Sequence, residues 1–413
     1  MMLPDLTNIK VKNSWQKTHL DNFIKMGWPS SKIEDWKFTS LSKMLKKPVE
    51  AGLNTKGDVS QITPNVQGAY RVVFRNGVFD SELSGGKNTS VVIGNLLDDA
   101  SAIACIKQAA LPDHPVFNLT LGAMQSAVVI DISETHSENI ALLDLSFVGG
   151  VINQSSHPLV MIRVAQNAKL KILETHASKN GVSAPIVFLN LENGAVCDHL
   201  RCQVADLDKT QLGLSLVNQN SHSDYRSFSL SSGGDISRTE MHLNLNGENA
   251  NCHLSAIYLG CKTQHMDITT RLYHNVANCK SEQVIRGVLD DRARGVFQGK
   301  IRVAQNAQKT DGQQMTRALL LSRETEANTK PELEIFADDV VCSHGATIGE
   351  IDDHQLFYLV SRGIPVMQAR SMLIEAFLID TLSQIRLPLL KEQAEYYIQD
   401  WITNSAQFSA LNR

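Results

Sequence analysis

The sequence lacks the patterns that would mark a secreted, membrane-spanning or disulfide-stapled protein. No window approaches 18 uninterrupted apolar residues, and the first residues contain no apolar segment of the kind found in secretion signals. The seven cysteines are an odd number without a C-x-x-C pair, which favours reduced thiols over a disulfide framework. These absences predict a cytoplasmic protein that binds no membrane.

An excess of basic residues is also missing. The 39 lysines and arginines are outnumbered by 43 aspartates and glutamates, and the formal net charge is −4. Because proteins that bind phosphate backbones are usually basic, we expect no nucleic-acid partner. At 413 residues, of which 43% are apolar, the chain is long and apolar enough for two or three folded units.

Common nucleotide-binding and catalytic motifs are absent as well. The segment from Gly295 to Ile301 has three residues between its glycines and an isoleucine after its lysine, whereas a P-loop has four residues there and Ser or Thr after the lysine. No G-x-S-x-G, H-E-x-x-H or G-x-G-x-x-G occurs. We therefore expect a chain that binds no nucleotide and is not an enzyme.

Residues 1–118 combine helical patterns with a hairpin, and we expect an N-terminal α/β unit. Ser14 can cap a first helix, Asp98-Asp99 precede another, and Pro115 closes the unit. Asn76-Gly77 between two strand-like runs is the strongest short-range signal for a β-hairpin.

Residues 119–348 are typical of a long β domain. Short runs rich in Val, Ile, Leu and Ser recur there, and 15 of the 27 asparagines lie between Asn139 and Asn306. Asparagine tolerates the left-handed backbone of tight corners. Regular short strands without a helical period predict a β-solenoid, with a sandwich or barrel as alternatives. The heptapeptide IRVAQNA occurs at 162–168 and again at 301–307, which is consistent with a repeated unit.

Residues 349–413 return to a helical period. Asp352-Asp353 can cap one helix that ends at Gly363, and Pro365 and Pro388 can each open another. The third helix carries an apolar stripe that either closes the core or docks on another protein: Leu390, Ala394, Tyr397, Ile398 and Trp401.

The segment from Lys330 to Gly349 contains the strongest candidate site. Cys342 and His344 are two positions apart, so a strand would place both side chains on one face. A thiolate beside an imidazole suits iron, zinc or an iron–sulfur unit. Two ligands leave a four-coordinate ion half satisfied, so the others would come from a partner at an interface. Asp338 and Asp339 predict a raised thiol pKa. The alternative is a small cysteine that only packs in the core.

A second group of histidines and cysteines gives a weaker signal. Strand alternation would put His265 and Asp267 on one face and His274 on the other. We interpret these histidines as surface or corner residues of the solenoid. Three cysteines without metal-ligand spacing are expected to pack in the interior, namely Cys252, Cys261 and Cys279.

Four segments match a known family over the chain from about residue 30 to the end. They are IEDWKFT at 33–39, the Asn76-Gly77 hairpin, the stretch 286–322, and KPELEIFADDVVCSHGATIGEIDDHQLFYLVSRGI at 330–364. Together they resemble the SufB/SufD family of the SUF iron–sulfur cluster assembly machinery. After the cysteine, SufB typically has Glu-His-Glu-Ala. This chain has Ser-His-Gly-Ala at 343–346, which points to the SufD branch.

The resemblance implies a mainly β protein with a right-handed parallel β-helix core between an N-terminal α/β unit and C-terminal helices. It implies a non-catalytic scaffold that pairs with a SufB-like subunit through the β-helix and binds a SufC-like ABC ATPase through the C-terminal helices. A homodimer is expected when the chain is alone. Cys342 and His344 coincide with the family's interface cysteine and histidine, which implies transient binding of iron or a nascent Fe–S cluster there.

Three other interpretations remain open at this point. A β-helix polysaccharide lyase or hydrolase would show clustered carboxylates along one face, whereas the acidic residues here are scattered. A structural interaction module would differ only in having no metal role for Cys342 and His344. A SufB-like paralogue would share the fold and the C-terminal half.

Overall fold

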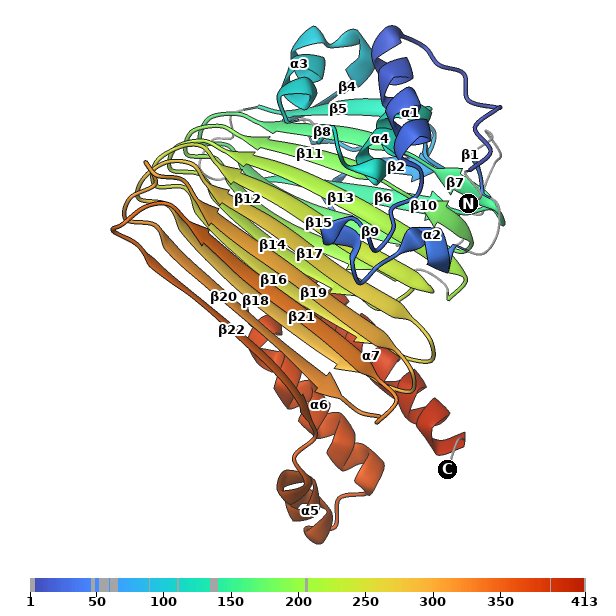
Figure 1. Cartoon of the computed structure of the whole chain (residues 1–413), viewed down its shortest axis with the longest axis vertical. Helices are drawn as coiled ribbons and strands as arrows, with labels where there is room; N and C mark the ends of the chain where they lie inside the picture. The colour runs from blue at the N-terminus through green and yellow to red at the C-terminus, as the bar shows by residue number, and fades with distance from the viewer. Residues whose placement is uncertain are drawn as a thin grey trace.

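The middle of the chain forms two parallel sheets that face each other (Figure 1). The computed structural model describes residues 4–45, 49–51, 59, 66–88, 90–109, 111–133, 140–204, 207–386 and 388–411. From β5 to β22 most successive strands alternate between the two sheets, which gives a parallel β-solenoid of about 7 turns. The predicted mainly β fold, a parallel β-helix with helices at both ends, is confirmed.

The first sheet, sheet A, is 12-stranded and ends at β21. Its strands are β1 (Glu50–Ala51), β4 (Val91–Asn95), β5 (Ala127–Ile132), β7 (Gln154–Ser156), β8 (Leu159–Val164), β10 (Gly181–Ser183), β11 (Ile186–Leu191), β13 (Lys209–Gln219), β15 (Ile236–Leu245), β17 (His265–His274), β19 (Arg294–Val303) and β21 (Glu326–Ile335).

The second sheet, sheet B, is 10-stranded and ends at β22. Its strands are β2 (Tyr70–Arg75), β3 (Val78–Phe79), β6 (Ala141–Gly149), β9 (Lys169–Ser178), β12 (Val196–Gln203), β14 (Asp224–Ser231), β16 (Asn251–Gly260), β18 (Lys280–Leu289), β20 (Asp311–Leu320) and β22 (Val341–Glu350). We call β21 and β22 the terminal rung.

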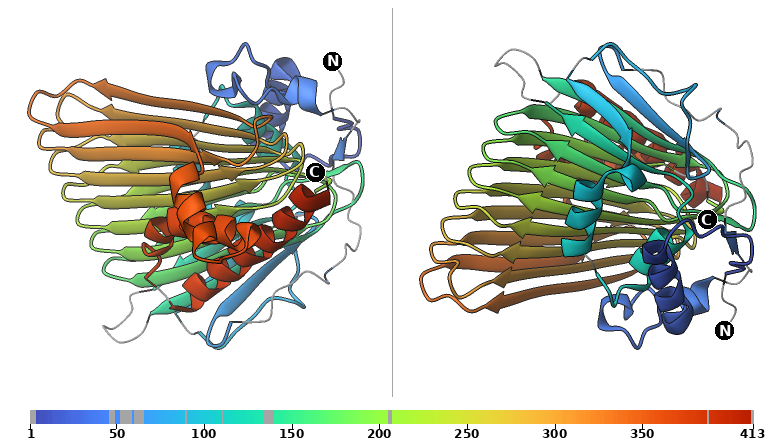
Figure 2. Two further views of the ribbon diagram at one scale, coloured as in Figure 1. Left: turned by 90° about the horizontal axis from the view of Figure 1, so that it is seen from below. Right: turned by 90° about the horizontal axis from the view of Figure 1, so that it is seen from above.

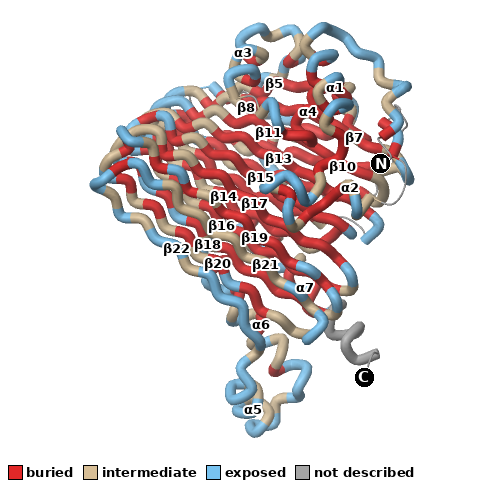
Figure 3. Tube along the Cα trace, in the orientation of Figure 1, coloured by how far each residue is buried: buried red, intermediate tan, exposed pale blue. Residues whose placement is uncertain are grey.

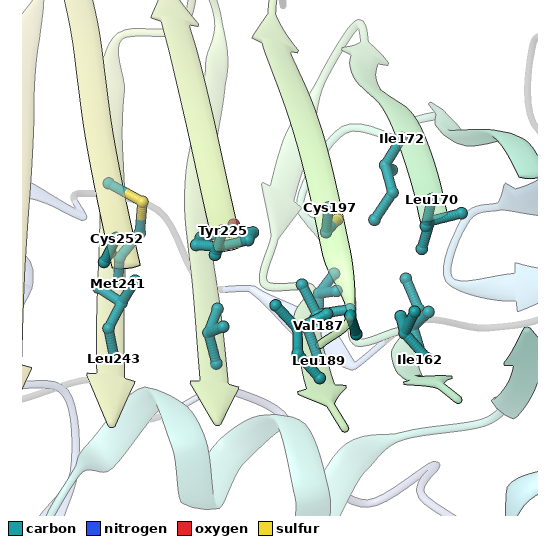
Figure 4. Close-up of a cluster of buried hydrophobic side chains, with 14 of the residues drawn as sticks. Ile162, Leu170, Ile172, Val187, Leu189, Cys197, Tyr225, Met241, Leu243 and Cys252 are labelled. Atoms are coloured by element: carbon teal, nitrogen blue, oxygen red, sulfur yellow. The ribbon is translucent and has the colours of Figure 1, made fainter. Parts of the chain in front are cut away.

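Strand alternation explains why the two sheets close on each other. In each long strand, every second side chain points between the sheets, where aliphatic residues and cysteines from both sheets meet (Figure 4). The parallel register stacks equivalent positions of successive turns, so that Glu240 of β15, Thr269 of β17 and Gln298 of β19 form one column. Burial of these apolar side chains is the main stabilising contribution.

The corners between strands confirm the expectation drawn from asparagine. Four asparagines at corners have left-handed backbones, with φ between 60° and 62°: Asn153, Asn167, Asn249 and Asn278. The two IRVAQNA copies are equivalent in place, because each forms the end of a sheet A strand (β8 or β19) and the turn that follows it. In each copy the N–H of the last alanine donates to the carbonyl three residues earlier.

The N-terminal elements agree with the local signals, with two differences. Helix α1 (Ser14–Met26) is capped by Asn13 and not by Ser14, because Asn13 Oδ1 accepts from the N–H of Gln16 at 2.8 Å. The Asn76-Gly77 hairpin and Asp99, the cap of α3 (Ala100–Gln108), are as predicted. The second difference is α4 (Pro115–Ala123), a helix that Pro115 opens where we expected only the end of a unit. The remaining short helices are η1 (Glu34–Trp36), α2 (Leu41–Met44) and η2 (Leu96–Asp98).

Three helices follow the terminal rung, as predicted: α5 (Asp353–Ser361), α6 (Val366–Leu382) and α7 (Pro388–Leu411). Asp352 caps α5, and Gly363 has a φ of 88°. Helices α6 and α7 cover the outer face of sheet B (Figure 2), where Leu390 and Ile398 pack against sheet residues such as Phe228. The apolar stripe of the third helix therefore closes a core.

The expected domain boundaries stay a prediction. Residue 118 lies inside α4, so a division at that point would cut a helix. Strand β2 pairs in parallel with β6, which joins the hairpin directly to sheet B. The boundary at 348 lies two residues before the end of β22.

Candidate functional site

Cys342 and His344 lie on β22, the last strand of sheet B. Their register partners on β20 are Gly312 and Gln314, which confirms that both occupy the same face of a strand. This face points toward the space between the sheets, since Cys342 packs against the main core. Cys342 is half-buried and His344 is exposed, so a partner chain can reach both positions.

The position of the Cys342 sulfur depends on a glycine in the neighbouring strand. A methyl group on Gly312 would lie 3.3 Å from Cys342 Sγ, so the sulfur rests directly over the bare backbone of β20. Burial raises the pKa of the Cys342 thiol, the N–H of Gly312 opposes this, and Asp311 adds to it. The predicted direction is confirmed, but the cause is burial and Asp311 rather than Asp338 and Asp339. The thiol therefore stays protonated at neutral pH until a metal or base displaces its proton.

The His344 ring is less constrained. No hydrogen-bond partner for it is found among the residues that the structure describes. Within the described part of the chain, no group of three or more His, Cys, Asp or Glu side chains could hold a metal ion. The arrangement thus offers one sulfur and one nitrogen, a soft and a borderline donor that fit iron but make only half of a four-coordinate shell.

The terminal rung leaves both sheets open at this end. Among the described strands, β21 and β22 each have a hydrogen-bonded neighbour on one side only within their sheets. A strand edge of this kind offers unpaired N–H and C=O groups to another chain. Four large apolar residues are exposed on or beside the rung: Ile335 (40%), Phe336 (56%), Val341 (66%) and Ile348 (44%).

The second histidine group is buried, which corrects the prediction of surface or corner residues. His265 is 5% and His274 is 0% exposed. His265 and Asp267 do share a face, because both contact the hydroxyl of Thr39. His274 Nε2 lies 2.8 Å from Ser281 Oγ, and burial lowers the pKa of His274 to about 4. Neither histidine is available as a ligand at the surface.

Cys252, Cys261 and Cys279 lie in the interior, and the segment from Gly295 to Ile301 lies within a strand. All seven cysteines are free thiols. Cys252, Cys261 and Cys279 are buried, and burial raises the pKa of each, to about 11 for Cys261. Gly295 to Ile301 lies within β19, so this segment is a strand and not a phosphate-binding loop.

Sequence reasoning missed what the segment IEDWKFT does. Trp36 is 1% exposed, and the Arg238 guanidinium lies 3.9 Å from its ring centre. Asp35 pairs with Arg271 of β17, and Glu34 pairs with Lys330 of β21. The segment 33–39 therefore forms a strap across the outer face of sheet A. These three contacts join residues more than 200 positions apart, so no local sequence pattern predicts them.

A buried ionic cluster inside the solenoid was also missed. The carboxylate of Glu174 lies close to two histidines and an arginine. Its oxygens are 2.9 Å from His199 Nε2, 2.5 Å from His176 Nε2 and 3.3 Å from Arg201 Nε. Burial lowers the pKa of His176 to about 4. The signal was present as polar residues at alternate positions, Glu174/His176 on β9 and His199/Arg201 on β12, which continue faces that begin with apolar residues.

The C-terminal helices offer a second exposed apolar surface. Helix α5 has no buried residue and projects beyond the solenoid (Figure 1). Phe357 (74%) and Tyr358 (57%) on α5, together with Val366 and Met367 at the start of α6, are exposed. Among the helices that the structure describes, none is both long enough and apolar enough to cross a bilayer.

Comparison with known proteins gives the family. Residues 147–377, which include Cys342 and His344, match the family model described as SUF system FeS cluster assembly, SufBD core domain. The iron–sulfur cluster assembly protein SufD of Escherichia coli is 31% identical over 91% of this chain and 89% of its own length. A SufBD family protein of Synechocystis is 31% identical over 88% of this chain and 85% of its own. The chain therefore belongs to the SufBD family of iron–sulfur cluster assembly proteins and is of the SufD type.

Proposed function

We propose that this chain is a scaffold subunit of an iron–sulfur cluster assembly complex of the SufB–SufC–SufD kind, not an enzyme. It pairs with a SufB-like subunit through the terminal rung, and it binds a SufC-like ABC ATPase through its C-terminal helices. Cys342 and His344 provide ligands for entering iron or for a nascent cluster, which is cargo and is held transiently. The observation that supports this proposal is that a thiol and an imidazole share one face of β22, which among the described strands has a hydrogen-bonded neighbour on one side only.

Two features of the terminal rung, its unpaired backbone groups and its exposed apolar residues, favour a partner interface there. Continuing a parallel sheet into another chain satisfies the unpaired backbone groups, and it covers Phe336 and Val341. The partner's own side chains then complete the ligand set. In the absence of a partner, the same edge would pair with a second copy of the chain.

The ligand role is tested on the purified complex. His344→Ala and Cys342→Ala should lower its iron and sulfide content while all subunits still co-purify. His222→Asn, at an exposed corner between β13 and β14, is the matched control and should change nothing. Full iron and sulfide loading of the His344→Ala complex would refute the ligand role.

The two interfaces are tested separately by charged substitutions. Val341→Lys should abolish pairing with the SufB-like subunit and also self-association, because it buries a charge at the sheet edge. Phe357→Glu should abolish co-purification with the SufC-like ATPase only. Ile152→Lys, which is 64% exposed near the other end of the solenoid, should affect neither. Unchanged co-purification of the first two variants would contradict these assignments.

A further inference from the structure

Gln314 on β20 carries a buried side-chain amide and lies next to His344, the exposed candidate ligand on β22. It is the register partner of His344 on the adjacent strand and points to the same inward face of sheet B. Its side chain is 2% exposed, and both Nε2 and Oε1 lack a hydrogen-bond partner among the described residues. In the described part of the chain, no other buried side-chain amide leaves both of its polar atoms unpaired.

The structure makes specific room for this amide. A methyl group on Gly299, in the opposing strand β19, would lie 2.3 Å from Gln314 Nε2 and 2.8 Å from its Cδ. The absence of a side chain at position 299 therefore gives the amide its space between the sheets. It lies one turn inside the terminal rung, next to other unpaired polar atoms, Gln283 Nε2 on β18 and Thr316 Oγ1 on β20.

A buried amide without partners is costly, since it loses its hydrogen bonds to water and gains none in return. A histidine that binds a metal through one ring nitrogen almost always donates the other ring N–H to a carbonyl or carboxylate oxygen, which fixes its tautomer and orientation. Adjacent strands are about 4.8 Å apart, so the amide of Gln314 can reach the His344 ring after a change of rotamer.

We propose that Gln314 is the positioning residue for His344. In the assembled complex its Oε1 accepts a hydrogen bond from the His344 ring nitrogen that does not bind iron, and the other nitrogen is left as the ligand. The inference rests on the proposed ligand role of His344. The inference assigns a role to a residue that touches neither iron nor the partner subunit. It also gives the buried amide of Gln314 a hydrogen bond.

Gln314→Met and Gln314→Glu separate the acceptor from the shape of the side chain. Methionine has similar volume without an amide, whereas glutamate keeps an acceptor oxygen in nearly the same place. Gln313→Met is the matched control, because Gln313 lies on the same strand but faces outward to Ser343. Ferrous iron is titrated anaerobically into the purified complex. Gln314→Met should weaken iron binding by about 10- to 100-fold, as is typical for loss of an outer-shell partner, whereas Gln314→Glu and Gln313→Met should remain near the original affinity.

A second measurement needs no iron. Nitrogen-15 NMR of the His344 ring in the complex should show one dominant tautomer in the original chain and in Gln314→Glu, and a tautomer mixture in Gln314→Met. If Gln314→Met does not fold, Gln314→Asn, whose amide is one methylene too short, should show the same two effects.

The outcomes distinguish this inference from the proposed function. If His344→Ala leaves iron binding unchanged, the ligand role itself fails. If His344→Ala abolishes binding but Gln314→Met keeps the original affinity and a single His344 tautomer, only the role of Gln314 is wrong, and its amide is satisfied by water.

Discussion

Asparagine has two distinct structural uses in this chain. At corners such as Asn167 and Asn278 it adopts the left-handed backbone that most other side chains avoid. On the outer face of sheet A it forms a ladder instead. Asn218 Nδ2 donates to Asn190 Oδ1 at 3.0 Å, and Asn244 Nδ2 donates to Asn218 Oδ1 at 3.1 Å. The parallel register places identical amides one strand apart, so each turn stabilises the next.

The ring of Tyr258 leaves no room for a side chain at its register partner, Gly287. A methyl group on Gly287 would lie 2.0 Å from the ring of Tyr258, its buried partner on β16. Because the ring cannot move in a packed core, we expect Gly287→Ala to lower the free energy of unfolding by about 1–3 kcal/mol in urea denaturation. Gly349→Ala is the control, since no atom lies within 4 Å of the added methyl, and it should be neutral or slightly stabilising. Equal effects of the two substitutions would disprove the packing argument.

Buried neutral histidines predict sensitivity to mild acid. Burial lowers the pKa of His274 to about 4 from an ordinary 6.5, so the unfolded chain takes up a proton first as the pH falls. The contribution of His274 to stability is complete above pH 6.5 and is lost as the pH falls from 6.5 toward 4. We expect a loss of about 2 kcal/mol between pH 7.5 and 5 from this residue alone. Urea denaturation of His274→Gln should show that much less dependence on pH, whereas His354→Gln, exposed on α5, should behave like the original chain.

At the scale of elements, the strap at 33–39 links the N-terminal part to four strands of sheet A. It contacts β15 through Arg238, β17 through Arg271, β19 through Gln298 and β21 through Lys330. Because Trp36 is buried against Arg238 and an apolar cluster, Trp36→Ala should cost about 3–5 kcal/mol of unfolding free energy. Ile33→Ala, at an exposed position of the same segment, should change it by less than about 0.5 kcal/mol. A neutral Trp36→Ala would show that the strap does not dock in solution.

The elements that the sequence predicted are those with local causes. Asn76-Gly77 fixes a tight hairpin, Asp99 caps α3, and Pro365 opens α6, each through atoms a few residues away. Alternation alone placed Cys342 and His344 on one face. The identity of their neighbours, Gly312 and Gln314, depends on register between strands 30 residues apart, which corner lengths determine and local patterns do not encode.

Burial was predicted less well than strand position. Alternation separated His265 from His274 correctly, but both are buried, because the strap covers one face and the solenoid interior contains the other. A polar residue in a strand usually marks the solvent face. In this fold both faces of a sheet are covered over part of its length, so the usual inference fails wherever a distant segment docks.

For the whole molecule, the covering is uneven along the solenoid. The first turns are covered by the N-terminal helices, and the outer face of sheet B is covered by α6 and α7. On the terminal rung, β21 meets the strap through the Glu34–Lys330 ion pair, whereas nearly all residues of β22 are exposed (Figure 3). The candidate ligands therefore lie at the start of the least covered strand of the β-helix, and the far end of the same strand leads into α5.

The uneven cover along the solenoid predicts which strand unfolds locally first. In a solenoid each turn is stabilised by its neighbours, so β22, with a neighbour on one side only, should exchange its amide hydrogens faster than β16, which is paired on both sides. Hydrogen-exchange mass spectrometry should show at least about a tenfold difference between peptides from the two strands. Adding a SufB-like partner should protect β21 and β22 and leave β16 unchanged. Protection confined to α5 and α6 would place the partner on the helices. It would rule out the terminal rung as the interface at which the partner supplies the missing iron ligands.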